Sequence, residues 1–142
     1  MGRIKLEMPD KFDYETEIPI RISDINYGGH LGHDAILPLT HEARVRFIKQ
    51  LGYSEANIEG AASIMADAVI VYKGQGFHGQ TLKIEIAASN FSKRGFDFLY
   101  RLTDTQTGNE IARVKTGIVF FDYAKQKPIE VPPKFRAVFP EI

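Results

Sequence analysis

The stretch SDINYGGHLGHDA, residues 23–35, concentrates side chains that can bind a ligand and move protons. It holds two histidines, His30 and His33, and imidazoles ordinarily titrate near neutral pH. The carboxylate of Asp24 and the amide of Asn26 stand shortly before them, and both groups can hold a water by hydrogen bonds. Three glycines in the same stretch allow a ligand to approach the main chain closely. We therefore expect a binding or reaction site at this junction.

A strand before the junction and a helix after it must position these side chains. Residues 14–22, YETEIPIRI, alternate apolar and polar side chains, which predicts a strand with one solvent-exposed face. Residues 35–53 carry apolar side chains at every third or fourth position, which predicts an amphipathic helix. We expect Asp34 to cap this helix, Pro38 to lie in its first turn and Gly52 to end it. The free amides and positive dipole at residues 34–37 would suit a polarised carbonyl oxygen.

Four more strands are predicted after the helix. The apolar run at residues 63–74 predicts a strand buried on both faces. Alternating patterns predict three others, at residues 81–91, 95–104 and 110–122, joined by short turns at 92–95 and 105–109. The proline-rich tail, residues 128–142, is expected to pack along the surface. The order predicts an α+β fold in which an antiparallel five-stranded sheet wraps around one long helix, and its unpaired edge favours a homodimer.

The composition excludes several classes of function. A length of 142 residues predicts one domain, residues 1–142, with a sizeable core. The absence of cysteine removes disulfides, a thiol nucleophile and thiolate zinc sites, and no other metal or cofactor motif is present. A formal net charge of zero does not favour a nucleic-acid partner. With no signal peptide and no apolar run of membrane-spanning length, the sequence predicts a soluble, cytoplasmic protein without a membrane partner.

Three motifs carry a family resemblance. They are Asp24-Ile25-Asn26, Gly29-His30 and, on the predicted helix, Glu42-Ala43-Arg44. Over residues 12–137 the chain resembles a hot-dog-fold acyl-CoA thioesterase of the 4-hydroxybenzoyl-CoA thioesterase type. The resemblance implies a hot-dog fold, hydrolysis of an acyl-CoA to free CoA and a carboxylic acid, and a homodimer or homotetramer.

The resemblance also assigns candidate catalytic residues, with one departure. Several members carry an aspartate nucleophile or base where this chain has Asn26, and a neutral amide can do neither. Glu42 matches the helical glutamate of the family and is the first choice of base; the alternative is a surface pair with Arg46. Asp67, a lone carboxylate in an apolar run, and Asp24, which otherwise caps a turn, are the other carboxylate candidates.

The histidines and Asn26 have supporting roles in this interpretation. His30 matches a histidine in the catalytic network of related acyl-carrier-protein thioesterases, and His33 is expected near the helix start. Asn26 would hold a water or the carbonyl; its alternative is a turn residue. His41 and His78 are expected at the surface.

A basic turn is the candidate site for the CoA carrier. Ser92, Lys93 and Arg94 lie between two predicted strands, where the resembling thioesterase binds the nucleotide phosphates. Two other functions remain open: a hot-dog hydratase or dehydratase using His30 and Glu42, and a non-catalytic acyl-CoA-binding protein, which Asn26 would favour. The sequence does not choose the acyl group, or CoA over acyl-carrier protein.

Overall fold

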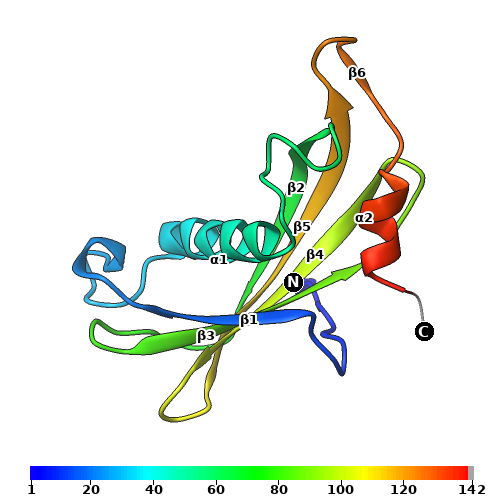
Figure 1. Ribbon diagram of the computed structural model, residues 1–142. Helices are drawn as coiled ribbons and strands as arrows, with labels where there is room; N and C mark the ends of the chain where they lie inside the picture. Colours follow the sequence, from blue (N-terminus) through cyan, green and yellow to red (C-terminus); the bar gives the residue numbers. More distant parts are fainter. Residues whose placement is uncertain (141–142) are drawn as a thin grey trace.

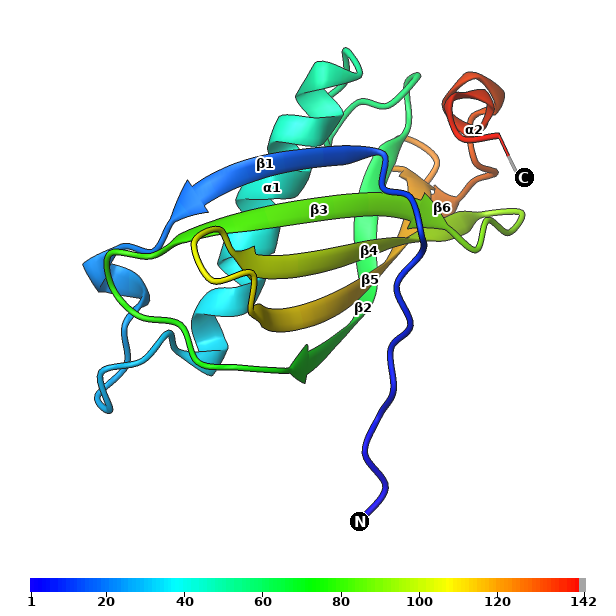
Figure 2. The same ribbon diagram turned by 90° about the horizontal axis from the view of Figure 1, so that it is seen from below.

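The computed structural model describes residues 1–140, so the last two residues of the predicted domain lie outside the described part. One sheet curls around the long helix α1 (Figures 1 and 2), and its antiparallel strands are ordered β1-β3-β4-β5-β2, with β6 paired to β5. The predicted α+β fold, with five main strands around one long helix, is confirmed. The elements are β1 Tyr14–Pro19, α1 Ile36–Gln50, β2 Ala62–Tyr72, β3 Thr81–Ser89, β4 Gly95–Asp104, β5 Glu110–Asp122, β6 Lys127–Pro128 and α2 Pro133–Val138, with 3-10 turns at Ile22–Asp24 and His33–Ala35.

The core lies between α1 and the inner face of the sheet. On β4, alternate side chains from Phe96 to Leu102 are buried, as the pattern predicted. From α1, Leu39, Ala43 and Phe47 point into the same core and are at most 2% exposed. Burying a large apolar side chain contributes about 2 kcal/mol, so this face fixes the helix across the sheet.

The helix α1 spans Ile36–Gln50, within the predicted residues 35–53, but its start differs from the prediction. The predicted cap by Asp34 is wrong: the chain first forms the 3-10 turn at His33–Ala35, and Ala35 precedes the helix without a side-chain cap. Pro38 lies in the first turn and Gly52, with φ of +90°, follows the helix end, both as predicted.

The first strand is shorter than predicted because the chain turns after Ile20. The carbonyl of Arg21 accepts the amide of Asp24 at 2.9 Å, which begins the 3-10 turn. Ile22 is consequently 71% exposed instead of facing the core, and Asp24 lies beyond the strand.

The strand β2 is an edge strand, and its predicted burial on both faces is wrong for a single chain. Its residues 65–68 are exposed, and only β5 pairs with it. The pairing register shifts between Met65 and Asp67, which marks a β-bulge. The apolar run therefore presents an open sheet edge.

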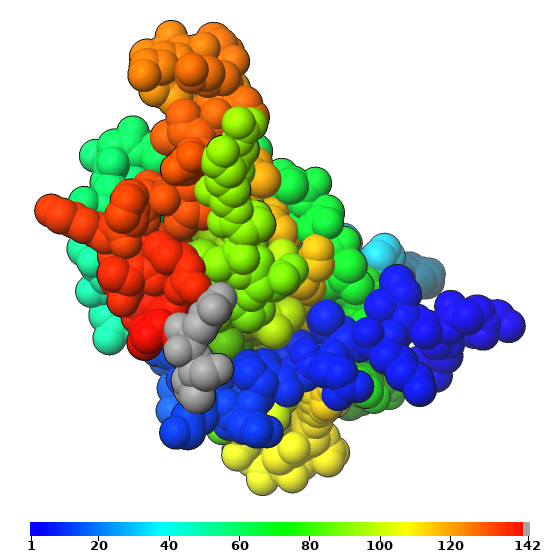
Figure 3. All heavy atoms as spheres, turned by 90° about the vertical axis from the view of Figure 1, so that its right-hand side faces the viewer, coloured from blue at the N-terminus to red at the C-terminus, as the bar shows by residue number. Residues whose placement is uncertain are grey.

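The C-terminal tail was expected to pack along the surface, but the structure gives it a larger role. It forms β6 and the short helix α2, whose Phe135 is fully buried and packs against Phe96 and Phe120. Figure 3 shows this segment, in orange and red, against the hairpin between β3 and β4, where the amide of Val131 donates to the carbonyl of Lys93. Of the described helices, none has the length and apolar character that crossing a membrane requires.

Candidate active site

The junction between β1 and α1 is held in shape by Asp24. Its carboxylate accepts the backbone amide of Arg21 at 2.8 Å and the Arg21 guanidinium at 3.2 Å. Its carbonyl accepts the amide of Gly32 at 2.9 Å, and the residue is only 6% exposed. Asp24 thus has the turn-capping role that the sequence analysis gave as the alternative to catalysis. Its carboxylate is already bonded to Arg21.

Asn26 organises the glycine-rich turn. Its side-chain oxygen accepts the amides of Gly28 at 3.0 Å and His30 at 3.2 Å, which is a turn-forming arrangement. Gly29 adopts φ of +82°, a conformation that favours glycine. The side-chain nitrogen Nδ2 of Asn26 donates to no group within residues 1–140 and stays available to a ligand, whereas its backbone amide donates to the carbonyl of His30 at 2.8 Å.

The two junction histidines have different surroundings. His30 is half-buried with its ring edge against Phe77, and its buried Nδ1 has no partner among the described residues. His33 is exposed, and its carbonyl accepts the Tyr72 hydroxyl at 3.4 Å. Because Tyr72 ends β2, this contact places the junction beside the open sheet edge.

The start of α1 offers two free backbone donors. In the described part of the chain, the amides of His33 and Asp34 donate to no acceptor, whereas that of Ala35 is bonded to Gly32. Both residues are exposed. Adjacent free amides at the positive end of a helix can stabilise an oxygen that gains negative charge.

Glu42 lies away from this pair, on the flank of α1 that faces β1. It is bonded to Arg46 at 2.9 Å, which is the surface ion pair that the sequence analysis gave as the alternative to a catalytic base. Together with Arg21 it lines a hollow of about 480 Å³ whose walls include Ile18 and Val45. The structure therefore brings Glu42 together with two guanidinium groups, and separates it from His33 by about 14 Å of helical rise.

Asp67 is not the lone buried carboxylate that the sequence suggested. Its side chain is 60% exposed at the bulge of β2, and it accepts Lys115 Nζ at 2.7 Å and the amide of Gly117 at 3.0 Å. The hydrogen bond from Lys115 lowers the pKa of Asp67 and, with the charge of Lys115 and the amide of Gly117, outweighs the opposing effect of desolvation. The carboxylate is stabilised in its charged form.

The basic turn lies at the opposite end of the sheet from the junction. Ser92 donates to the carbonyl of Gly95, and Lys93 lies 3.5 Å from Glu130. Arg94 is exposed. Since β4 starts beside this turn and spans ten residues, roughly 30 Å separates the turn from the junction in one chain.

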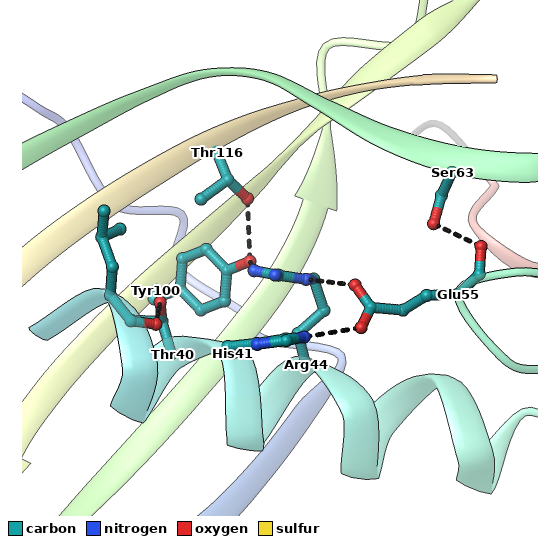
Figure 4. A network of polar contacts seen from close by, with 8 residues as sticks. Thr40, His41, Arg44, Glu55, Ser63, Tyr100 and Thr116 are labelled. Carbon is teal, nitrogen blue, oxygen red and sulfur yellow. Dashed lines mark hydrogen bonds and ion pairs between the residues drawn. The ribbon is translucent and has the colours of Figure 1, made fainter. Parts of the chain in front are cut away.

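Sequence reasoning missed a buried polar network under α1 (Figure 4). Arg44, 4% exposed, donates to the Tyr100 hydroxyl at 3.0 Å and to Glu55 at 3.2 Å. Tyr100 is bonded to Thr116 at 2.8 Å, and Glu55 is bonded to His41 Nε2 at 2.7 Å. The network thus runs from the sheet interior to the surface.

Electrostatics keep the charged members of this network ionised. Burial alone would lower the pKa of Arg44, but Tyr100 and Glu55 outweigh it and raise that pKa. Burial would likewise raise the pKa of Glu55, yet His41 and Arg44 lower it. The sequence signal for such a network was Arg44, a charged residue on the apolar face of the helix beside Ala43.

Several solved structures are similar to this chain in fold. The PA2801 protein from Pseudomonas aeruginosa has 19% identity and a TM-score of 0.82, over 90% of this chain and 98% of the other. Slr0204, a 1,4-dihydroxy-2-naphthoyl-CoA thioesterase from Synechocystis, has 19% identity and a TM-score of 0.80, over 87% and 93%. A DHNA-CoA thioesterase from Staphylococcus aureus has 23% identity and a TM-score of 0.75, over 87% and 84%.

These structures share the fold of the chain, and the sequence itself provides the assignment. No curated protein matches the sequence. The family model of the thioesterase-like superfamily matches residues 20–139, which include the junction, α1 and the whole sheet after β1. The chain therefore belongs to the thioesterase-like superfamily.

Proposed function

We propose that the protein is an acyl-CoA thioester hydrolase that releases free CoA and a carboxylic acid by direct attack of water. The observation that carries this proposal is the pair of free amides at His33 and Asp34, in a member of the thioesterase-like superfamily. Asn26 cannot serve as a nucleophile, and the chain has no cysteine. The carboxylates of Asp24, Glu42 and Asp67 are each paired with a cation, which favours water as the attacking group.

The free amides would bind the thioester carbonyl. Charge moves onto this oxygen when water attacks, and donors fixed in advance at a helix start stabilise that charge. The glycines of the junction let the thioester reach the main chain, and the unpartnered amide of Asn26 can hold the water or the carbonyl. His30 and His33 would complete the polar wall of this site.

A second copy of the chain would complete the cleft through the open edge of β2. Antiparallel pairing of two β2 edges about a two-fold axis would satisfy their free backbone groups and cover the exposed residues 65–68. The same rotation exchanges the ends of the sheets. The turn with Ser92, Lys93 and Arg94 of the second copy would then lie at the junction end, where it could bind CoA phosphates.

Two groups on α1 can take the proton from the attacking water. One is Glu42 in its hollow, the family-like choice. The other is His41, which also borders that hollow but is paired with Glu55 in the loop after the helix. Glu42 is paired with Arg46 instead, so the two candidates have different partners.

Product identification tests the proposal. The protein is incubated with short-chain, medium-chain, long-chain and aromatic acyl-CoAs. The products are then separated by chromatography and identified by mass spectrometry. The proposal expects free CoA and the carboxylic acid from at least one class. An intact thioester with a changed double bond would indicate a hydratase or dehydratase, and saturable binding without any product would indicate a binding protein.

A further inference from the structure

The helix α1 presents two chemically different flanks. Glu42 and Arg46 lie on the flank that faces β1, where Arg46 also donates to Thr16 Oγ1 at 2.8 Å. His41 and Arg44 lie on the other flank, where both bind Glu55 in the loop that leads into β2. Since β1 and β2 are the opposite edges of the sheet, only the second flank faces the open edge of β2.

His41 is held in one orientation by its partner. Its Nε2 lies 2.7 Å from Glu55 Oε1, and its Nδ1 has no partner within residues 1–140. A carboxylate on Nε2 fixes the tautomer with the proton on that nitrogen, which leaves Nδ1 as a proton acceptor. This is the arrangement in which a carboxylate orients a histidine base.

Glu55 is in turn held from inside the protein. Arg44 binds its second oxygen and is itself fixed to the Tyr100 hydroxyl, which Thr116 bonds from the next strand. Figure 4 shows Arg44 and His41 reaching Glu55 side by side from α1. The backbone carbonyl of Glu55 also accepts the Ser63 hydroxyl at 2.9 Å, which ties the loop to the start of β2. A surface pair alone would not need such a rigid support.

We propose that His41 is the general base of the hydrolysis, with Glu55 as its positioning residue, and this inference rests on the proposed function. His41 Nδ1 takes a proton from water as the water oxygen attacks the thioester carbon. The carbon–sulfur bond then breaks, and the thiolate leaves and takes up the proton that His41 carries. The products are the carboxylic acid and free CoA, and His41 returns to its neutral form.

The site combines two copies of the chain. Within one copy, His41 follows His33 by about 12 Å of helical rise, which is too far for one water to join Nδ1 and the amides. Antiparallel pairing at β2 sets the two α1 helices antiparallel on the same sheet face. The start of one helix then lies toward the middle of the other, so that His41 of one copy can serve the free amides of the second.

The pH dependence of kcat/KM separates this base from Glu42. The charged groups around His41 are Glu55 and Arg44 on one side, and Glu42, Arg21 and Arg46 around the hollow that it also lines. Because an imidazole ordinarily titrates at higher pH than a carboxylic acid, a histidine base gives an acid limb at higher pH than a glutamate base does. The position of the acid limb in the wild-type profile, measured with the acyl-CoA that is hydrolysed fastest, therefore indicates whether a histidine or a carboxylate is the base.

Variants make the assignment specific. We expect His41→Gln to lower kcat by about 100-fold or more and to remove the limb, with KM changed little. Glu55→Gln should lower kcat with little change in KM, because the imidazole loses the carboxylate that orients it; a role in stability alone would lower the melting temperature and leave kcat of the folded protein unchanged. Glu42→Gln should leave the limb in place. Glu15→Gln, an exposed residue without an ion pair in the described part of the chain, is the matched control.

The results of these experiments separate a failure of the His41 assignment from a failure of the proposed hydrolysis. An acid limb that Glu42→Gln removes, with His41→Gln retaining its rate, overturns the role of His41 while hydrolysis itself stands. An absence of hydrolysis for every acyl-CoA with folded wild-type protein overturns both proposals. Circular dichroism of each variant shows whether a loss of rate reflects a loss of fold, and His41→Asn is a second substitution at the same exposed position.

Discussion

Arg44 Nη1 donates to the Tyr100 hydroxyl at 3.0 Å inside the protein, which joins α1 to the middle of the sheet through a buried charge. The contact matters because Arg44 also holds Glu55, and Glu55 holds His41. The interior of the fold and the candidate base thus belong to one hydrogen-bonded chain.

Removing either partner of this contact, Arg44 or the Tyr100 hydroxyl, should destabilise the protein. Arg44→Met removes one member of a buried ionic network, and we expect a loss of about 3 kcal/mol in the free energy of unfolding. Tyr100→Phe should cost about 1 kcal/mol, since it deletes one hydroxyl. Urea unfolding of both variants and of the double variant should give a coupling of about 1 kcal/mol. Strict additivity would contradict the direct contact.

Glu55 should make stability depend on acid. Its pKa is lowered in the folded state, because the hydrogen bonds and charges of His41 and Arg44 outweigh the effect of burial. A lowered folded-state pKa contributes stability above the pKa of an unfolded glutamate, about 4.3, and that contribution is lost as the pH falls through the folded value.

Thermal unfolding between pH 7 and pH 3 measures this contribution. Glu55→Gln should lower the melting temperature at pH 7 and show a smaller further loss on acidification than the wild type. Glu15→Gln should follow the wild-type curve. Parallel curves for wild type and Glu55→Gln would show that the ion pair does not form in solution.

The C-terminal helix should stabilise the core. Phe135 is fully buried among aromatic rings of β4, β5 and the β3–β4 hairpin. We expect Phe135→Ala to cost about 3–5 kcal/mol, because it leaves a cavity that the surrounding rings cannot fill. Val138→Ala, at an exposed position of the same helix, should change stability little. Chemical unfolding compares the two, and equal small losses would mean that the tail only covers the surface.

A charge on the open edge should prevent dimerisation. Ala68 lies in the exposed part of β2, and a lysine there would be buried without a partner by edge pairing. We expect Ala68→Lys to be a folded monomer with little activity, whereas Ala124→Lys on the distant β5–β6 turn keeps the wild-type assembly. Light scattering after size exclusion reports the mass. A wild-type monomer that is fully active would exclude the two-copy site.

The regular elements could be predicted because their periodicity records which face is buried. The alternation in β4 and the spacing of Leu39, Ala43 and Phe47 on α1 each have one good solution in a layered fold. The edge position of β2 could not be predicted in the same way. A continuous apolar run fits a central strand and an edge strand that a second chain covers equally well.

The candidate site was only partly predictable for a related reason. The junction residues are neighbours in sequence, so their clustering was evident. Arg44, Glu55 and Tyr100 are far apart in sequence, and each taken alone resembles an ordinary helix, loop or core residue. Only the fold shows that they meet, and that Glu42 and His41, which are adjacent in sequence, bind different partners.

Release of free thiol from acyl-CoAs would show thioester hydrolysis by this protein itself. A colorimetric thiol reagent can follow it continuously, because the chain contains no cysteine to react. We predict enzyme-dependent, saturable release from at least one acyl class, with an acid limb in the pH profile that is lost in His41→Gln. If the folded wild-type protein binds acyl-CoAs but releases no thiol from any of them, the protein is not a thioester hydrolase.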